Sequence, residues 1–287
     1  MNQMSSIFER LITELERQGS HYSEPQSFQE YSGITDKTAS YISVQDIDDL
    51  KPDLRKASYM VFRLGSRPKN RTTHFGLAKL RQNDNWAEYF LIDHDIFKDT
   101  EPEIFLPNVS VRQLFAFNLL SQLTENSLIN LAISSGLLAS ALGLESSESL
   151  AAPASGHSIF TFNFKVSPDA PIWEHIEGQV EIDALFVGKL NKKETLFVIE
   201  AKTSTEFKSL AKHKLVYPIL GLRTVIPGSI PIIPVYIRAI KIKGKREIKF
   251  YIAICNELNE INNSGLIILN KLEVNYVKHF ILIGYND

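Results

Sequence analysis

Five segments in the C-terminal half of the chain either alternate apolar and polar residues or are rich in β-branched residues. Both patterns are typical of strands. One segment among them, residues 204–218, has a helical pattern and lies between the third and fourth strands. The predicted strands span residues 159–166, 179–187, 194–202, 230–240 and 247–258. This order predicts a mixed β-sheet with a helix inserted after its third strand.

The N-terminal part of the chain has a pattern of its own. Apolar side chains recur at helical spacing over residues 5–18, and residues 43–50 contain a short helix that Ser43 can cap. Three further segments, 59–64, 73–80 and 86–93, read as strands. We therefore expect an α+β accessory domain over residues 1–107.

A strongly apolar helical stretch follows at residues 110–144. Part of it loosely resembles a helix-turn-helix, but its second helix has no basic or amide side chain to contact a base edge. A buried helical hairpin is the favoured interpretation. We expect a second domain over residues 108–287, with a helical lead-in over 108–145 and an exposed loop over 145–158. The expected fold class is α+β or α/β, with a mixed sheet core flanked by helices.

The composition fits a soluble globular protein, since 44% of the 287 residues are hydrophobic and 22% are charged. Apolar runs are too short for a membrane helix, and the acidic N-terminus is unlike a secretory signal, so a cytoplasmic location is the default expectation. Cys255 is the only cysteine, which excludes an internal disulfide and a Cys-rich zinc site. Residues 202–249 hold eleven Lys or Arg against two acids, a balance of +9. Either a polyanion partner or a solvated basic surface explains this balance.

Carboxylates interrupt two neighbouring apolar strands. If the strands at 179–187 and 194–202 pair through the turn between them, Asp183 and Glu200 meet on one face, with Lys202 one pleat further along. Two adjacent carboxylates repel each other, and a hard divalent cation removes that repulsion. Such a cation also lowers the pKa of a bound water, which Lys202 could orient or help to deprotonate. Cross-strand pairing of Glu and Lys on a surface is the plainer alternative.

The pattern acid-x-Lys occurs four times, and its context selects one of them. Only Glu200-Ala201-Lys202 follows an apolar strand and has an acidic strand a short turn upstream. The adjacent Asp93, His94 and Asp95 resemble a metal site, but three consecutive strand residues cannot face one ion. We interpret them as a turn.

The arrangement of Asp183 and Glu200-Ala201-Lys202 resembles the PD-(D/E)xK nuclease superfamily, in particular type II restriction endonucleases. Ile182 replaces the proline that usually precedes the family's aspartate. The resemblance implies that Asp183, Glu200 and the backbone carbonyl of Ala201 bind Mg²⁺, with Mn²⁺ as a substitute, and that Lys202 serves the attacking water. Glu125 and Glu181 are candidates for an additional acid.

Basic residues in two regions are candidates for DNA contact. The first region is the hairpin between the strands at 59–64 and 73–80, and the second follows the proposed lysine. The side chains are those of Arg63, Arg67, Lys69, Asn70, Arg71, Lys208, Lys212, His213 and Lys214. Arg and Asn read guanine and adenine edges in the major groove. A solvated surface explains the same residues about equally well.

The resemblance implies a Mg²⁺-dependent endonuclease that acts on double-stranded DNA, with restriction of foreign DNA as the expected role. Cleavage of both strands needs two sites, so a homodimer is expected. A cognate methyltransferase or another defence-system protein is the expected partner, and no membrane partner is expected. Three alternatives stay open: a nuclease subunit of a defence or repair complex, a junction-type nuclease, and a catalytically silent DNA-binding module.

Overall fold

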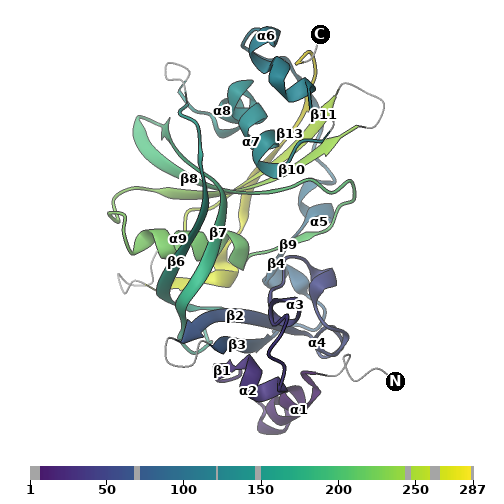
Figure 1. Cartoon of the computed structure of the whole chain (residues 1–287), viewed down its shortest axis with the longest axis vertical. Helices are drawn as coiled ribbons and strands as arrows, with labels where there is room; N and C mark the ends of the chain where they lie inside the picture. Colours follow the sequence, from purple (N-terminus) through teal and green to yellow (C-terminus); the bar gives the residue numbers. More distant parts are fainter. Residues whose placement is uncertain are drawn as a thin grey trace.

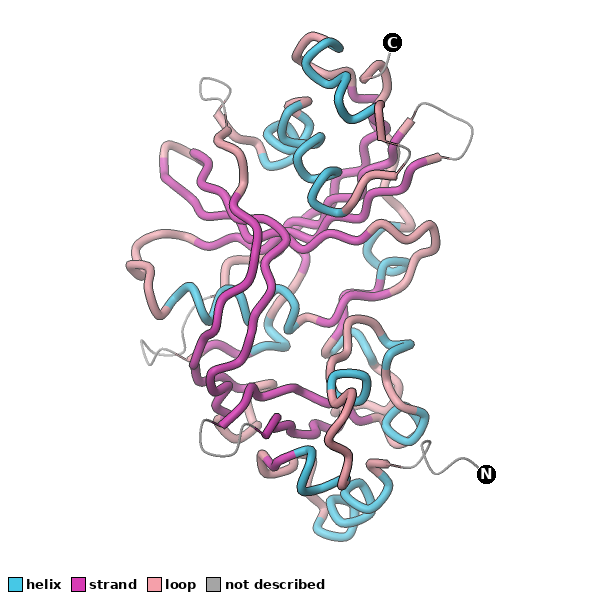
Figure 2. Tube along the Cα trace, in the orientation of Figure 1, coloured by secondary structure: helices cyan, strands magenta, loops and turns pink. Residues whose placement is uncertain are grey.

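The fold is described from a computed structural model of the whole chain. The structure describes residues 7–67, 72–120, 122–145, 150–242, 247–258 and 266–285. Its central feature is a large mixed sheet that runs the length of the molecule (Figure 1). Figure 2 shows helices lying on both sides of this sheet and at its ends. The mixed sheet flanked by helices confirms the expected α+β class.

Among the described residues, the sheet has the strand order β1-β3-β2-β7-β8-β10-β11-β13-β5, with β6 beside β7 and β12 beside β6. A small separate sheet joins β4 to β9. The strands are β1 (Gln26–Ser27), β2 (Tyr59–Arg67), β3 (Thr72–Lys79), β4 (Phe90–Ile92), β5 (Glu103–Phe105), β6 (Ala154–Lys165), β7 (Trp173–Leu190), β8 (Lys193–Lys202), β9 (Ser209–Ala211), β10 (Ile232–Lys241), β11 (Ile248–Cys255), β12 (Ile267–Ile268) and β13 (Val274–Leu282).

The helices are mostly short. They are α1 (Glu9–Gln18), α2 (Phe28–Ser32), α3 (Ala39–Ile42), α4 (Pro52–Lys56), α5 (Asp93–Phe97), α6 (Val111–Leu114), α7 (Glu125–Ser134), α8 (Leu137–Leu142) and α9 (His213–Arg223). Short 3₁₀ turns span Ile47–Asp49, Trp86–Glu88, Phe115–Asn118 and Leu269–Lys271. None of the described helices is both long and apolar enough to cross a membrane.

The two faces of the sheet pack against different helices. Ala184 and Phe186 of β7, with Phe197 and Ile199 of β8, belong to a core that α7 and α8 cover. Val198, on the opposite face of β8, packs into the core that contains α9. The expected alternation along β7 and β8 is thus observed, and α7 and α8 form the buried helical hairpin that the sequence predicts.

The connection between β8 and β10 is a parallel crossover, as the predicted helix between these strands requires. The helix itself starts later than predicted. Residues 204–208 form an irregular loop, β9 follows, and α9 begins at His213. The loop and β9 are extended because Ser209–Ala211 pairs with β4 rather than coiling. The helix prediction for residues 204–212 was therefore wrong.

Two further predictions need correction. The predicted strand at 86–93 is a 3₁₀ turn followed by the short β4, which pairs with β9 and not with the β2–β3 hairpin. The predicted loop at 145–158 overlaps strand β6. This strand begins at Ala154, which pairs with Leu185 of β7.

Segments on both sides of residue 107 contribute strands to the same sheet. Gly65 of β2 pairs with Ile176 of β7, and β5 pairs with β13 near the C-terminus. A Cβ atom on Gly65 would overlap the carbonyl of Ile176, and its φ of +77° also favours glycine. The accessory domain over 1–107 and the second domain over 108–287 remain predictions.

Candidate functional site

The candidate site lies on the hairpin formed by β7 and β8. These strands pair in antiparallel register from Leu190–Lys193 to Ala184–Ile199. Asn191 and Lys192 join them, with φ angles of 49° and 65°. Positive φ at both central residues is the geometry of the tight turns that suit the twist of a hairpin. The predicted pairing of the two strands is confirmed, and Asp183 and Glu200 occupy the next position in the register.

Asp183 is attached to the neighbouring strand by its side chain. The backbone N–H of Ala201 donates a hydrogen bond to Asp183 Oδ2 at 2.8 Å. The regular ladder between the two strands ends just before this point. The carboxylate therefore satisfies an N–H group that the β7 backbone no longer reaches, and this bond fixes where the carboxylate lies.

Glu200 is the most buried acid of the group, with 2% of its surface exposed. Lys202 Nζ donates to its Oε1 at 2.8 Å, and Lys214 Nζ at the start of α9 lies 3.6 Å from the same oxygen. Burial raises the pKa of Glu200, and the two lysines oppose that shift. Burial alone would lower the pKa of Lys202, but Glu200, Glu125 and Asp183 outweigh it and raise this pKa.

Both candidates for an additional acid lie at the cluster. Glu125 Oε2, in the first turn of α7, is 3.9 Å from Lys202 Nζ. Glu181 Oε2, further back along β7, is 3.7 Å from Lys214 Nζ. The Thr124 side chain caps α7 and thereby helps to set the position of Glu125. Burial raises the pKa of Glu125, while Lys202 opposes the shift.

We call Glu125, Glu181, Asp183, Glu200, Lys202 and Lys214 the carboxylate cluster. With every group ionised, it holds four negative and two positive charges, a surplus of two negative charges. Within the described ranges, no three His, Cys, Asp or Glu side chains are arranged to hold one metal ion. A cation here would thus rely on two carboxylates, with backbone or water oxygens as further ligands. The set of Asp183, Glu200 and the Ala201 carbonyl remains a prediction.

The candidate DNA-contacting residues have different environments. Lys208 Nζ lies 3.5 Å from Asp46 and 3.9 Å from Asp48. Lys212 is 5% exposed, and burial lowers its pKa to about 8, so little of this side chain is free for a phosphate. Arg67 is exposed at the end of β2.

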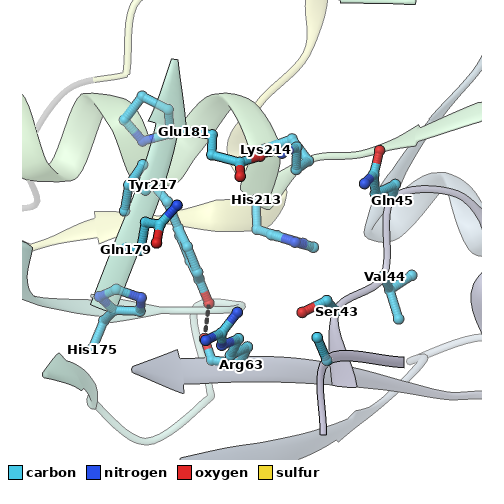
Figure 3. A pocket seen from close by; sticks show the side chains of 13 residues that line it. Ser43, Val44, Gln45, Arg63, His175, Gln179, Glu181, His213, Lys214 and Tyr217 are labelled. Atoms are coloured by element: carbon cyan, nitrogen blue, oxygen red, sulfur yellow. Dashed lines mark hydrogen bonds and ion pairs between the residues drawn. The ribbon is translucent and has the colours of Figure 1, made fainter. Parts of the chain in front are cut away.

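The remaining candidates divide into two groups. Lys69, Asn70 and Arg71 lie outside the described residues. Arg63, His213 and Lys214 line a pocket beside the carboxylate cluster (Figure 3). Contact of any of these residues with DNA remains a prediction.

A buried ion pair behind Lys202 was not predicted. Arg238 of β10, which pairs in register with Lys202, contacts Asp93 Oδ2 at 2.5 Å, and both side chains are almost fully buried. Arg238 Nη1 also donates to the carbonyls of Ser204 and Glu206, at 3.0 and 2.8 Å. This network fixes the loop that follows Lys202.

Asp93 holds the same loop from the other side. Its Oδ2 accepts the backbone N–H of Lys208 at 2.7 Å, and its Oδ1 accepts the Tyr236 hydroxyl at 2.8 Å. Asp93 begins helix α5, so the interpretation of residues 93–95 as a turn was wrong. An arginine in the apolar strand 230–240 was the available signal, since a buried charge requires a partner.

Comparison with known proteins places the chain in a family for which no activity is described. No curated protein and no solved structure matches the chain. A family model described as a domain of unknown function, DUF6997, matches residues 92–266, which include the carboxylate cluster and the ion pair beneath it. This match covers more than half of the chain, and the protein therefore belongs to the DUF6997 family.

Proposed function

We propose that the protein is a Mg²⁺-dependent DNA endonuclease of the PD-(D/E)xK type. One observation carries the proposal. Asp183 and Glu200 lie at adjacent positions of paired strands, where the ladder ends, and Lys202 contacts Glu200. The order of β6, β7, β8, α9, β10 and β11 and the parallel pairing of β8 with β10 also support it.

The donor set suits a hard divalent cation. Mg²⁺ commonly takes one or two carboxylates and completes its shell with water and phosphate oxygens. Asp183 Oδ1 and Glu200 Oε2 have no hydrogen-bond partner among the described residues, so each acid has one oxygen to offer. The surplus of two negative charges in the cluster equals the charge of one such ion. When bound, the ion would supply charge neutralisation at the attacked phosphate and a lowered pKa for an attacking water.

The residues of the chain then have separate roles. Asp183 and Glu200 would hold the ion, and the Ala201 carbonyl would be a third ligand. Lys202, held between Glu200 and Glu125, would orient the attacking water or hold a phosphate oxygen. In the reaction, the water oxygen bonds to phosphorus opposite the 3′ oxygen and gives up a proton to solvent, the P–O3′ bond breaks, and the leaving oxygen takes a proton.

The biological role that we favour is restriction of foreign DNA by a homodimer, because one chain offers one candidate site and duplex cleavage needs two. A nuclease subunit of a larger complex, or a nuclease for branched DNA, would use the same cluster. The substrate therefore distinguishes these roles, and the residues of the site do not.

Purified protein incubated with phage, plasmid and branched DNA tests the proposal, with Mg²⁺, Mn²⁺ or EDTA. The variants are Glu200→Gln and the matched control Glu206→Gln, since Glu206-Phe207-Lys208 repeats the acid-x-Lys pattern at an exposed position. We expect cleavage with either metal, lost in EDTA and in Glu200→Gln, and kept in Glu206→Gln. Discrete fragments support restriction, and a preference for branched DNA supports a junction nuclease. Absence of cleavage with every metal and substrate rejects the enzymatic function.

A further inference from the structure

A pocket of about 280 Å³ lies beside the carboxylate cluster, at the junction of four parts of the chain (Figure 3). Strand β7 contributes His175 and Gln179, helix α9 contributes His213 and Tyr217, and β2 contributes Arg63. The segment after α3, from Ser43 to Gln45, forms the opposite wall. The volume is just under the range of about 300–1,000 Å³ that is typical of sites for drug-sized ligands, so the occupant is a small group.

The pocket is continuous with the candidate site. Glu181 and Lys214 line it, and Lys214 Nζ is also 3.6 Å from Glu200 Oε1. Figure 3 shows Glu181 and Lys214 next to each other between β7 and α9. A group bound in this pocket would therefore lie near a phosphate held at Asp183 and Glu200.

The inner walls of the pocket are held in place by aromatic contacts. The His175 ring stacks on Phe162 with a centroid distance of 4.6 Å and an interplanar angle of 6°. Tyr217 donates its hydroxyl hydrogen to the Arg63 carbonyl at 3.2 Å. Gly178 is needed next to His175, because a Cβ atom at this position would overlap the imidazole ring. The pocket is thus formed before any ligand arrives.

Several polar groups of the pocket have no partner. His213 Nδ1 is buried without a hydrogen bond, and Arg63 has no ion pair among the described residues. The side-chain amides of Gln45 and Gln179 likewise make no hydrogen bond within the described part of the chain. A buried polar atom without a partner is uncommon in folded proteins, so a ligand is the simplest explanation for His213 Nδ1, and the exposed amides of Gln45 and Gln179 are free to contact the same ligand.

The chemistry of these groups selects a base over an anion. Burial lowers the pKa of His213 to about 3 and that of His175 to about 4, so both rings are neutral at pH 7. His213 has one donor and one acceptor nitrogen, whereas Nδ1 of His175 donates to the Phe160 carbonyl at 3.3 Å and leaves Nε2 as an acceptor. Two amides add both donors and acceptors, and the charges of Glu181 and Lys214 are already paired with each other at 3.7 Å. Amide and guanidinium groups are the side chains that pair with base edges.

We infer that this pocket binds one unpaired nucleobase of the DNA substrate, next to the phosphate that is cleaved. The inference rests on the proposed function, because that function supplies the DNA. A base reaches such a pocket only when it leaves the stack, and this costs least for a single-stranded, mismatched or damaged base. The pocket then makes cleavage depend on the identity of the base.

Binding of nucleotides in EDTA tests the inference without any cleavage. The probes are the four deoxynucleoside 5′-monophosphates, 5-methyl-dCMP and N6-methyl-dAMP, measured against the full chain by calorimetry or ligand-observed NMR. The base-free control is 2-deoxyribose 5-phosphate. We expect at least one nucleotide to bind about tenfold more tightly than this control, which corresponds to one or two net hydrogen bonds.

Variants locate the binding. Gln179→Ala should weaken it by about two- to tenfold, and Ser43→Phe should block the pocket. Gln82→Ala, an exposed glutamine remote from the pocket lining, should leave it unchanged. Equal binding of all probes and the sugar phosphate overturns the inference, as does wild-type binding by both pocket variants. A protein that cleaves DNA with Mg²⁺ but fails this assay keeps the proposed function, and one that binds a nucleotide here but never cleaves loses that function instead.

Discussion

Asp183 accepts a hydrogen bond from the backbone N–H of Ala201, which is the residue between Glu200 and Lys202. This bond ties one candidate metal ligand to the strand that carries the other. Because the bond uses only Oδ2, the second oxygen of the carboxylate remains for a cation. Asp183 therefore combines a structural and a chemical role, and substitutions can separate them.

Asp183→Asn keeps an oxygen that accepts from Ala201 but loses the negative charge. We expect the free energy of unfolding to change by less than about 1 kcal/mol, while Mg²⁺-dependent cleavage falls by at least about 100-fold. Urea denaturation and plasmid cleavage measure the two quantities. Asp183→Ala should lower both. If Asp183→Asn cleaves DNA like the wild type, Asp183 is not a metal ligand of the site.

Lys202→Met removes an ammonium group that contacts Glu200 and Glu125. We expect cleavage to fall by about 10²–10⁴-fold, because the attacking water loses the group that orients it or the phosphate loses a cation. Binding of DNA in Ca²⁺ should stay within about threefold, since one contact among many is lost. Lys51→Met is the control, because Asp49-Leu50-Lys51 repeats the acid-x-Lys pattern outside the candidate site. Equal losses in both variants would show a general charge effect.

The ion pair of Asp93 and Arg238 makes a prediction about stability. Removal of one partner leaves a buried charge unpaired, so Asp93→Asn or Arg238→Met should lower the free energy of unfolding by about 3–5 kcal/mol. Chemical denaturation measures the loss. The control is Lys278→Met, which breaks a partly exposed pair with Glu103 and should cost less than about 1 kcal/mol. Similar losses of unfolding free energy in all these variants would contradict the burial of the Asp93–Arg238 pair.

The buried His175 and the half-buried His213 of the pocket predict acid sensitivity. Their pKa values in the folded protein, about 3 for His213 and about 4 for His175, are below the ordinary value of about 6.5. Between the folded and the unfolded pKa values, the unfolded chain therefore binds more protons than the folded protein. The free energy of unfolding is thus unaffected by these histidines above about pH 6.5 and decreases as the pH falls below it. Each histidine contributes a slope of up to about 1.4 kcal/mol per pH unit.

Urea unfolding at pH 5 and pH 7 measures this slope. His213→Asn should reduce the difference in stability between the two pH values, whereas replacement of the exposed His94 by Asn should not. A His213→Asn protein with the pH dependence of the wild type would show that His213 ionises normally in the folded state.

Local pattern was enough to predict the hairpin and its charged residues. Alternation along β7 and β8 put Asp183 and Glu200 on one face, and the short turn between the strands set their register. The helical hairpin of α7 and α8 was also predicted from local pattern. These features depend on neighbouring residues or on short connections, which a pattern records directly.

Features that depend on distant partners were missed. The segment 204–212 has helical spacing, but pairing with β4 and anchoring by Arg238 hold it in an extended path. Asp93 looked like part of a surface turn because its partners, Arg238 and Tyr236, lie far along the chain. The contact of Lys214 with Glu200 follows from where α9 begins, and that start was predicted too early.

The network around Asp93 also has a consequence for how the protein folds. Asp93 and Tyr236 are 143 residues apart in sequence, whereas a two-residue turn joins β7 to β8. Contacts of short separation form sooner, because closing a long loop costs more entropy. We expect the acids to come together early and the loop behind Lys202 to settle late. The candidate site would then be complete only late in folding, after most of the sheet has formed.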